Sequence, residues 1–259
     1  MKHVAASAIA AAEPVAQRLG ETDRPRTAGC LVRLLSGFAL VCAALVAPAS
    51  QAEPLDAAAE RYRPLMAEEI DHSLAGARAL HDALLANDLE AAQRAWIAAR
   101  VGWERAEVFT SGFTELDAEI DAWPNAVSGF HAIEAKLFGA RLMDVQPETD
   151  ALIFHLTDLR LKIRDTRLTA QGLLNGAAKL AYEVGESKAA GGESPYSGNS
   201  VREVGDNLAG ILAAYETVFS AGVKASDAGL DAAVRDDIAR LRALVDGADI
   251  KSLDQEELR

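Results

Sequence analysis

The first candidate for chemistry is the pair His131 and Glu134, which stand three residues apart in the stretch SGFHAIEAKLFG. Spacings of three and four place side chains on one face of a helix, so the imidazole and the carboxylate are expected to converge on one metal ion. The pair is not the His-Glu-x-x-His pattern of zinc proteases, and it is not doubled as in di-iron bundles. By itself it is a weak signal, because a lone histidine on a helix is more often a surface or core residue.

Two further carboxylates, Glu104 and Glu107, share this spacing in the stretch ARVGWERAEVF. We expect them to face one side of a preceding helix, on which Trp96 and Trp103 pack into the core. The alternative is that both glutamates are solvated and that Glu104 pairs with Arg100, which would give the protein little stability.

A third feature is the acidic segment from Glu115 to Asp121, which connects the two predicted helices. Residues 110–127 contain glycine, proline and asparagine, and we expect them to be irregular. Carboxylates in such a connection often cap helices, and they could equally reach over a cleft between the helices.

The N-terminal residues 1–52 are expected to be a leader with a signal peptide. A positive flank at Arg33, a short apolar core and the small-residue sequence Ser50-Gln51-Ala52 favour a signal peptide over a membrane anchor. Residues 53–259 then form the helical domain, without a membrane span. They contain no cysteine, because Cys30 and Cys42 both lie in the leader.

The remaining composition limits both the metal and the partner. Without thiolates, a metal is bound by oxygen and imidazole, a ligand set that suits iron, manganese or zinc, with copper as a further candidate. From Glu53 on, the chain has 21 basic and 36 acidic residues, a formal charge of −15. Such a charge disfavours nucleic acid and anionic membranes as partners, and it favours cations.

Apolar residues recur every three to four positions, which predicts an all-α, up-and-down helical bundle. Two four-helix-like halves, before and after about residue 145, remain possible within it. Residues 149–186 are expected to form one long helix or two, with a break near Thr169 or Gly172, and residues 185–200 a loop. The predicted helices are 57–85, 87–109, 127–138, 149–186, 201–223 and 227–245. The second is expected to begin at an Asn87-x-x-Glu90 capping pattern.

Together with the run FTELDAEIDAW, these motifs resemble the signature of the imelysin-like proteins, specifically the EfeO/EfeM branch of periplasmic iron-uptake proteins. The segment LLNGAAKLAYEVGESKAAGGESPYS and a helix start at residues 206–210 (DNLAG) are also similar to that family. The likeness covers roughly residues 57–225. The sequence departs from the family at residues 196–200, where Tyr-Ser-Gly-Asn-Ser replaces Tyr-Ser-His-Thr-Asp, and it lacks the cupredoxin domain of longer members.

The resemblance implies a periplasmic protein of a Gram-negative bacterium that binds iron, as Fe³⁺ or Fe²⁺. It also implies delivery to an inner-membrane iron permease, with a periplasmic peroxidase as a further partner. The site that it implies consists of one histidine and several carboxylates: His131, Glu134, Glu104, Glu107, Asp121 and Glu183.

Two other functions compete with iron capture. The family has been grouped with peptidases, but no His-Glu-x-x-His pattern and no Ser/His/Asp or Cys/His set is present to support a metallopeptidase. Some relatives bind acidic polysaccharides such as alginate. A charge of −15 opposes direct binding of a polyanion unless cations or a local basic cleft intervene.

Overall fold

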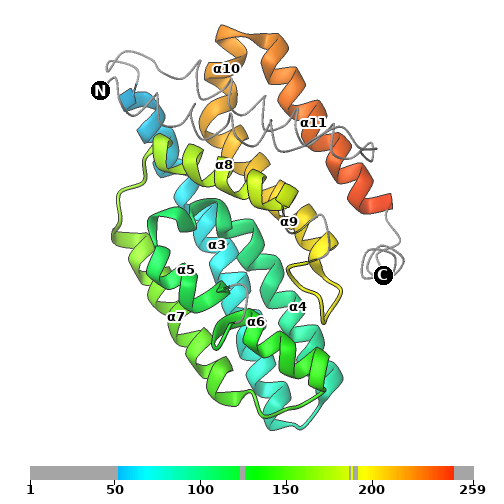
Figure 1. Cartoon of the computed structure of the whole chain (residues 1–259). Helices are drawn as coiled ribbons and strands as arrows, with labels where there is room; N and C mark the ends of the chain where they lie inside the picture. Colours follow the sequence, from blue (N-terminus) through cyan, green and yellow to red (C-terminus); the bar gives the residue numbers. More distant parts are fainter. Residues whose placement is uncertain (1–51, 123–125, 187, 189–191, 248–259) are drawn as a thin grey trace.

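The computed structural model describes residues 52–122, 126–186, 188 and 192–247, and within these residues the chain is all-α, with no strand. Figure 1 shows the resulting bundle of long helices with shorter ones packed on it. No helix among the described residues is both long enough and apolar enough to cross a membrane. The predicted signal peptide and both cysteines lie outside the described residues.

Most helices follow one another with short connections, as expected for a bundle, and the longest connection is residues 187–199, between the eighth and ninth labelled helices. Their bounds are α3 (Ala52–Leu85), α4 (Leu89–Ala106), η1 (Glu107–Gly112), α5 (Thr114–Asp121), α6 (Gly129–Glu134), η2 (Ala135–Ala140), α7 (Gln146–Asp165), α8 (Ala170–Glu186), α9 (Ser200–Ala214), η4 (Tyr215–Phe219), α10 (Ser220–Ser226) and α11 (Ala228–Gly247).

Helices α3 and α4 form the antiparallel pair on which the other helices pack. The predicted apolar stripe of α3 is buried at Ile70, Leu74, Ala77 and Leu80, so its three- and four-residue spacing faces the core. Helix α4 begins one residue later than the capping pattern predicted. Asp88, not the residue before it, accepts the backbone N–H of residue 91 at 2.9 Å and satisfies one of the free donors of the first turn.

The long segment 149–186 divides into two helices, α7 and α8, separated by residues 166–169. The start of α8 and the connection before it are held by carboxylates of α3. The backbone N–H of Leu168 donates to Glu60, and that of Ala170 donates to Asp56, each at 2.9 Å. These bonds satisfy donors that have no partner within their own helix, and they fix α8 across the bundle.

The prediction that residues 110–127 are irregular is wrong for the acidic segment. Thr114–Asp121 is a helix, α5, preceded by the 3₁₀ turn η1. Leu116 and Ile120, four residues apart, are both buried and attach one face of this short helix to the core. Packing therefore overrides the turn-forming residues nearby.

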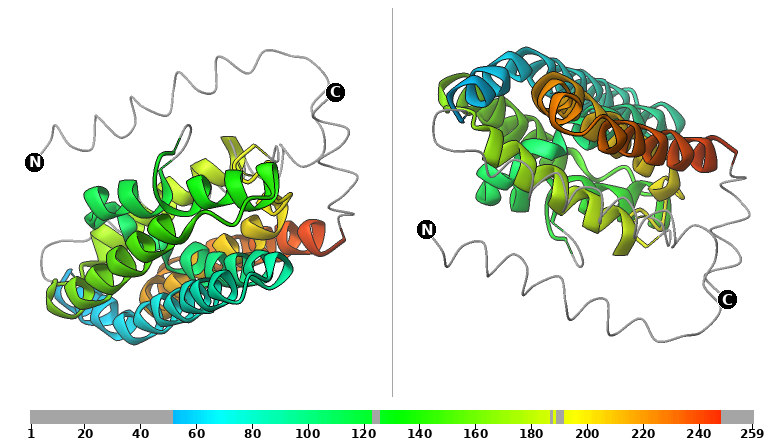
Figure 2. Two further views of the ribbon diagram at one scale, coloured as in Figure 1. Left: turned by 90° about the horizontal axis from the view of Figure 1, so that it is seen from below. Right: turned by 90° about the horizontal axis from the view of Figure 1, so that it is seen from above.

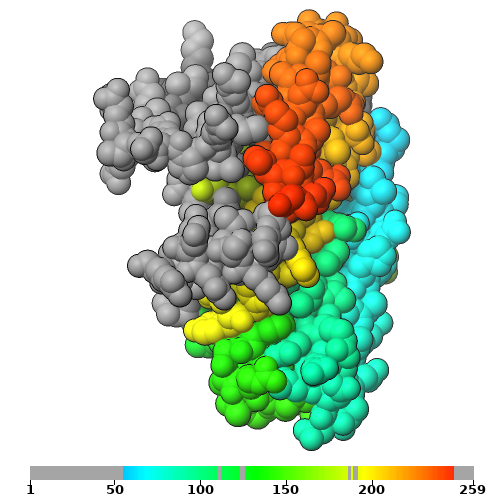
Figure 3. All heavy atoms as spheres, turned by 90° about the vertical axis from the view of Figure 1, so that its right-hand side faces the viewer, coloured from blue at the N-terminus to red at the C-terminus, as the bar shows by residue number. Residues whose placement is uncertain are grey.

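The C-terminal part is one bent helical path. Helix α9 continues through the π-helical η4 into α10, and α11 packs back on α9. Residues 206–210 lie within α9 and not at a helix start. Seen end-on, α5, α6 and α7 lie on one side of the molecule, and α3, α4, α10 and α11 lie on the other (Figure 2). The space-filling view shows α11 above and beside α3 and α4 on one face (Figure 3).

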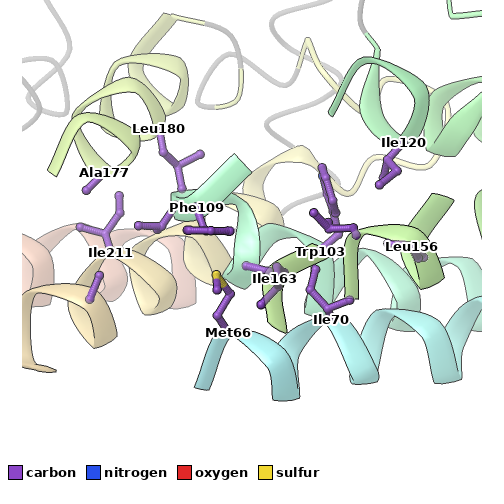
Figure 4. Close-up of a cluster of buried hydrophobic side chains, with 14 of the residues drawn as sticks. Met66, Ile70, Trp103, Phe109, Ile120, Leu156, Ile163, Ala177, Leu180 and Ile211 are labelled. Atoms are coloured by element: carbon purple, nitrogen blue, oxygen red, sulfur yellow. The ribbon is translucent and has the colours of Figure 1, made fainter. Parts of the chain in front are cut away.

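One cluster of buried apolar side chains draws on helices from α3 to α11, so both sequence halves share a core. Figure 4 shows part of it, with Phe109 between Leu180 and Met66, and Trp103 near Ile70. Trp96 and Trp103 are both fully buried, as predicted.

Candidate metal centre

The inner face of α4 and the start of η1 carry charged side chains into the bundle. Arg100 and Glu104 are 0% exposed, and Glu107 is 7% exposed. The alternative that these glutamates are solvated is therefore wrong, although the expected ion pair between Arg100 and Glu104 is present. A buried carboxylate is costly unless charges or hydrogen bonds compensate it, so these residues imply a polar cluster inside the core.

Arg100 is the centre of that cluster. Its guanidinium group contacts Glu104 on its own helix, Asp121 at the end of α5 and Glu203 on α9. The Nε–Oε1 distance to Glu203 is 2.9 Å, and the ring centroid of Phe130 lies 5.1 Å from the guanidinium carbon. One cation thus joins carboxylates from three helices, which is the fork geometry that arginine provides.

Helix α6 is packed so closely on α5 that His131 reaches Asp121. Gly129, at the start of α6, has φ +70°, and a Cβ there would collide with the carbonyl oxygen of Ile120. Glycine is needed at this point for both reasons. The result is a distance of 3.1 Å between Nε2 of His131 and Oδ1 of Asp121. The indole of Trp103 donates to the other oxygen of Asp121 at 2.6 Å.

The pair of His131 and Asp121 favours the ionised form of both side chains. Burial alone would lower the pKa of His131, but the charge of Asp121 and its hydrogen bond outweigh burial and raise the pKa to about 9. Burial would raise the pKa of Asp121, but the positive charges of Arg100 and His131 hold it well below its ordinary value. At neutral pH the pair is an imidazolium and a carboxylate, so a metal ion must compete with a proton for His131.

Glu134 is buried next to His131 but divides its two oxygens between different partners. Oε1 accepts the backbone N–H of Tyr196 at 3.1 Å and both the N–H and the hydroxyl of Ser197 at 2.8 Å. Oε2 lies 3.8 Å from Nδ1 of His131. Glu134 therefore fastens the connection after α8 to α6 and turns its second oxygen toward the imidazole.

Three residues that the sequence did not predict as site residues, Lys188, Glu193 and Asn207, complete the other half of the cluster. Lys188 places its Nζ 2.5 Å from Oε2 of Glu104, 2.9 Å from Oε2 of Glu107 and 3.4 Å from Oε1 of Glu193. The side-chain amide of Asn207, on α9, donates to Oε2 of Glu104 at 2.7 Å and to Oε2 of Glu107 at 3.2 Å. Within the described structure, the buried Oδ1 of Asn207 has no hydrogen-bond donor.

Burial dominates the ionisation of these glutamates. It raises the pKa of Glu104 and of Glu107 although the charge of Lys188 acts in the opposite direction. It also raises the pKa of Glu193 to about 7. A further cation would stabilise the ionised form of these buried carboxylates. This half of the cluster is therefore suited to binding a metal ion.

Two groups of potential metal ligands bring their donor atoms within 4.8 Å of one another. Their members are Asp121, His131 and Glu193 in one group, and Glu104, Glu107 and Asp121 in the other. Asp121 belongs to both, so the two groups adjoin. Imidazole and carboxylate donors without sulfur suit iron, manganese or zinc.

A pocket of about 260 Å³ adjoins both groups. Its charged lining consists of Glu107, Asp117, Asp121, Lys179, Glu183 and Glu193. Glu183, the sixth predicted site residue, lies here with its carboxylate 3.0 Å from Nζ of Lys179. It is in neither of the two ligand groups, whereas the other five predicted residues lie in or directly against the buried cluster.

The comparison with known families agrees with the motifs. The imelysin family model matches residues 58–126 and 115–256. The chain belongs to the imelysin family. Within this imelysin chain, the match includes α4, α5, α6, α8 and α9, which are the helices that carry the cluster.

Curated relatives of this imelysin chain include iron-uptake components. The iron uptake system component EfeM of Bacillus subtilis is 33% identical over 144 residues, which cover 53% of the chain and 37% of the relative. An Efem/EfeO family lipoprotein of Staphylococcus haemolyticus is 26% identical over 203 residues, or 74% of the chain and 70% of the relative. The iron uptake system component EfeO of Escherichia coli O1:K1 is 28% identical over 166 residues, which cover 60% of the chain and 44% of the relative. The matched part of the chain thus spans less than half of the length of two of these relatives.

Proposed function

We propose that this chain is an extracytoplasmic iron-binding protein that captures iron at the buried cluster and passes it to an inner-membrane permease. The observation that carries the proposal is the convergence of His131, Asp121 and Glu193 on one point beside Glu104 and Glu107. The names of the relatives, as components of iron uptake systems, support iron as the cargo. Periplasmic location and a partner peroxidase belong to the same proposal.

The charge balance of the cluster supports a highly charged cargo. Six buried carboxylates face three cationic groups, Arg100, Lys188 and the His131 imidazolium. The carboxylates are those of Glu104, Glu107, Glu134, Glu193 and Glu203, together with Asp121, whose side chain is 5% exposed. A metal ion that displaces the protons from the glutamates with raised pKa values would meet three uncompensated negative charges, and Fe²⁺ or Fe³⁺ would offset them. Carboxylates also bind hard cations in preference to soft ones.

The pocket supports capture at this point of the fold. Its charged lining holds five carboxylates and one lysine, and three of those carboxylates are also members of the ligand groups. An acidic lining raises the local concentration of cations and directs them toward the cluster. The same lining opposes an acidic polysaccharide, so we do not propose that ligand.

Calorimetry tests the proposal directly. Residues 53–259 are titrated with Fe²⁺ without oxygen and with Fe³⁺ supplied as its nitrilotriacetate complex. Tight binding that His131→Ala abolishes and His72→Ala leaves intact is expected, because His72 is an exposed histidine on α3 that pairs only with Glu69 in the described structure. Equal iron binding by the wild type and a variant with alanine at positions 104, 107, 131 and 134 would overturn the site.

The peptidase label of the family gives the test a second arm. Casein and mixed peptides are incubated with the same protein, with and without Zn²⁺. Cleavage that depends on Glu134, in a preparation that binds no iron, would replace iron capture by a metallopeptidase function. Metal analysis of protein purified from the periplasm identifies the native cargo.

A further inference from the structure

Lys188 is a lysine buried completely among carboxylates. Its side chain is 1% exposed, and its Nζ contacts Glu104, Glu107 and Glu193 at 2.5, 2.9 and 3.4 Å. Burial lowers the pKa of a lysine, but here the three carboxylates outweigh burial and hold the pKa well above its ordinary value. The three carboxylates around Nζ thus favour the charged ammonium form of this side chain within the core.

The oxygens that hold this ammonium group are metal-ligand candidates. Glu104 and Glu107 form one of the two ligand groups with Asp121, and Glu193 belongs to the other. Lys188 contacts Oε2 of both Glu104 and Glu107. A metal ion bonded to those same two oxygens, at the usual distance of about 2.0–2.2 Å, would overlap the ammonium group. The two cations cannot use these oxygens together.

We propose that Lys188 is a tethered countercation, which competes with metal ions for Glu104 and Glu107 and which a bound metal displaces. This inference rests on the proposed function of the cluster as a metal site. A fixed ammonium group neutralises part of the repulsion between neighbouring carboxylates and keeps the helices that carry them together. It also weakens the net affinity for metal, because every binding event must break the buried ion pairs of Lys188 with Glu104 and Glu107. A protein that passes its cargo on needs such a limit on affinity.

The surroundings of Lys188 give its displaced side chain a destination. Glu107 and Glu193, two of its three partners, also line the acidic pocket. The pocket holds further carboxylates at Asp117 and Glu183, which already pair with Lys179 at 3.8 and 3.0 Å. An ammonium group that moves away from Glu104 thus stays among negative charges, which reduces the cost of displacement.

Amine labelling of the wild-type protein tests displacement without a variant. Two samples of the protein, one containing a chelator and the other saturating Zn²⁺, are treated briefly with acetic anhydride. Acetylation of each lysine is then quantified by mass spectrometry. Acetylation of Lys188 is expected to be slow in the sample with the chelator and at least several-fold faster in the sample with Zn²⁺. Lys162, an exposed lysine of α7 that pairs with Asp158 at 3.0 Å, should react equally in both and serves as the internal control.

The outcomes separate the two proposals. If calorimetry shows that Zn²⁺ binds in a His131-dependent manner while labelling of Lys188 is unchanged or slower, the countercation role is overturned and the metal site stands. If neither Zn²⁺ nor iron binds the wild type, the metal site is overturned and the countercation role falls with it.

Lys188→Met provides an independent readout, with Lys162→Met as the matched loss of one positive charge. Removing the tethered competitor is expected to tighten Zn²⁺ binding about tenfold or more, because the metal then relieves carboxylates that have lost their cation. With a chelator present, the thermal midpoint of Lys188→Met should fall, and the rise in midpoint on adding Zn²⁺ should exceed that of the wild type. Equal or weaker Zn²⁺ binding by a folded Lys188→Met protein would overturn the proposal.

Discussion

Nε2 of His131 lies 3.1 Å from Oδ1 of Asp121, so the histidine of the H-x-x-E motif is paired with an aspartate from the preceding helix. The glutamate of the motif is farther away, with 3.8 Å between its Oε2 and Nδ1 of the imidazole. The partner that controls the charge of His131 is therefore outside the motif. This relationship makes the pH dependence of stability a direct test of the cluster.

The pair of His131 and Asp121 should stabilise the protein at low pH more than at high pH. The pKa of His131 is raised from 6.5 to about 9. A group whose pKa is raised by folding contributes its full stabilisation below the unfolded pKa and loses it as the pH rises through the folded pKa. With a chelator present, the difference in free energy of unfolding between wild type and His131→Gln should shrink by on the order of 3 kcal/mol from pH 6 to pH 10.

Urea denaturation at several pH values measures this difference. His72→Gln is the control, because it replaces an exposed histidine of the same fold. Its free energy of unfolding should run parallel to that of the wild type. A constant difference between wild type and His131→Gln over this pH range would contradict a buried imidazolium–carboxylate pair.

Asp121→Asn should damage both stability and metal binding. The substitution leaves the charges of Arg100 and His131 buried without their shared carboxylate, and breaking a buried pair in this way costs about 3 kcal/mol or more. Iron affinity should fall about 100-fold or more, since Asp121 is common to both ligand groups. Asp117→Asn, in the pocket lining, is the matched control and should change the affinity far less. If Asp117→Asn abolished iron binding and Asp121→Asn did not, the metal site would lie in the pocket and not at the buried cluster.

Glu134→Gln separates a ligand from a positioning residue. Tyr196 and Ser197 donate three hydrogen bonds to Oε1, so the amide oxygen of glutamine should take that position and the NH₂ group should face His131. Stability should then fall by about 1–3 kcal/mol, because the NH₂ group faces an N–H of the imidazolium and replaces a charge that favours it, while iron affinity falls about tenfold or more if Oε2 is a ligand. Unchanged iron affinity would show that Glu134 only holds the connection in place.

Gly210→Ala should disturb the cluster from a distance. A Cβ at Gly210 would collide with the backbone carbonyl of Arg105, where α9 crosses α4. Moving α9 outward would pull Asn207 away from Glu104, and overpacking of this kind costs about 1–3 kcal/mol. Gly222→Ala is the control, because nothing lies within 4 Å of its added Cβ. Thermal midpoints and iron titration of both variants compare the two positions. Equal midpoints would contradict a close approach of the helices at Gly210.

The sequence predicted the helical fold well because the apolar spacing of α3, α7 and α9 is local and regular. Local spacing also identified Glu104, Glu107, His131 and Glu134, since each pair lies one helical turn apart. The acidic segment was misjudged as irregular because its helix depends on packing of Leu116 and Ile120, and no local signal reports that packing.

The residues that sequence reasoning missed are held in place by long-range contacts. Lys188 and Glu203 are 81 to 103 positions from their partners on α4 and η1, and Glu193 joins the cluster through Lys188. The segment that carries Lys188 and Glu193 resembles the family, but no local spacing marks these two residues as members of the site. Arg100 was noticed as a partner of Glu104, but an ion pair four residues apart is normally a surface feature. Only burial shows that this pair belongs to the centre of the protein.

The contacts of Arg100 also bear on the order in which the molecule assembles. Its guanidinium group meets Glu104, Asp121 and Glu203, which lie on three separate helices, the last more than 100 residues along the chain. Until α9 docks, the cation and its carboxylates prefer water to a half-formed core. The centre is therefore complete only when α9 has docked. Truncated or partly folded chains should lack the ion-binding centre altogether, which limits premature metal capture by chains that have not finished folding.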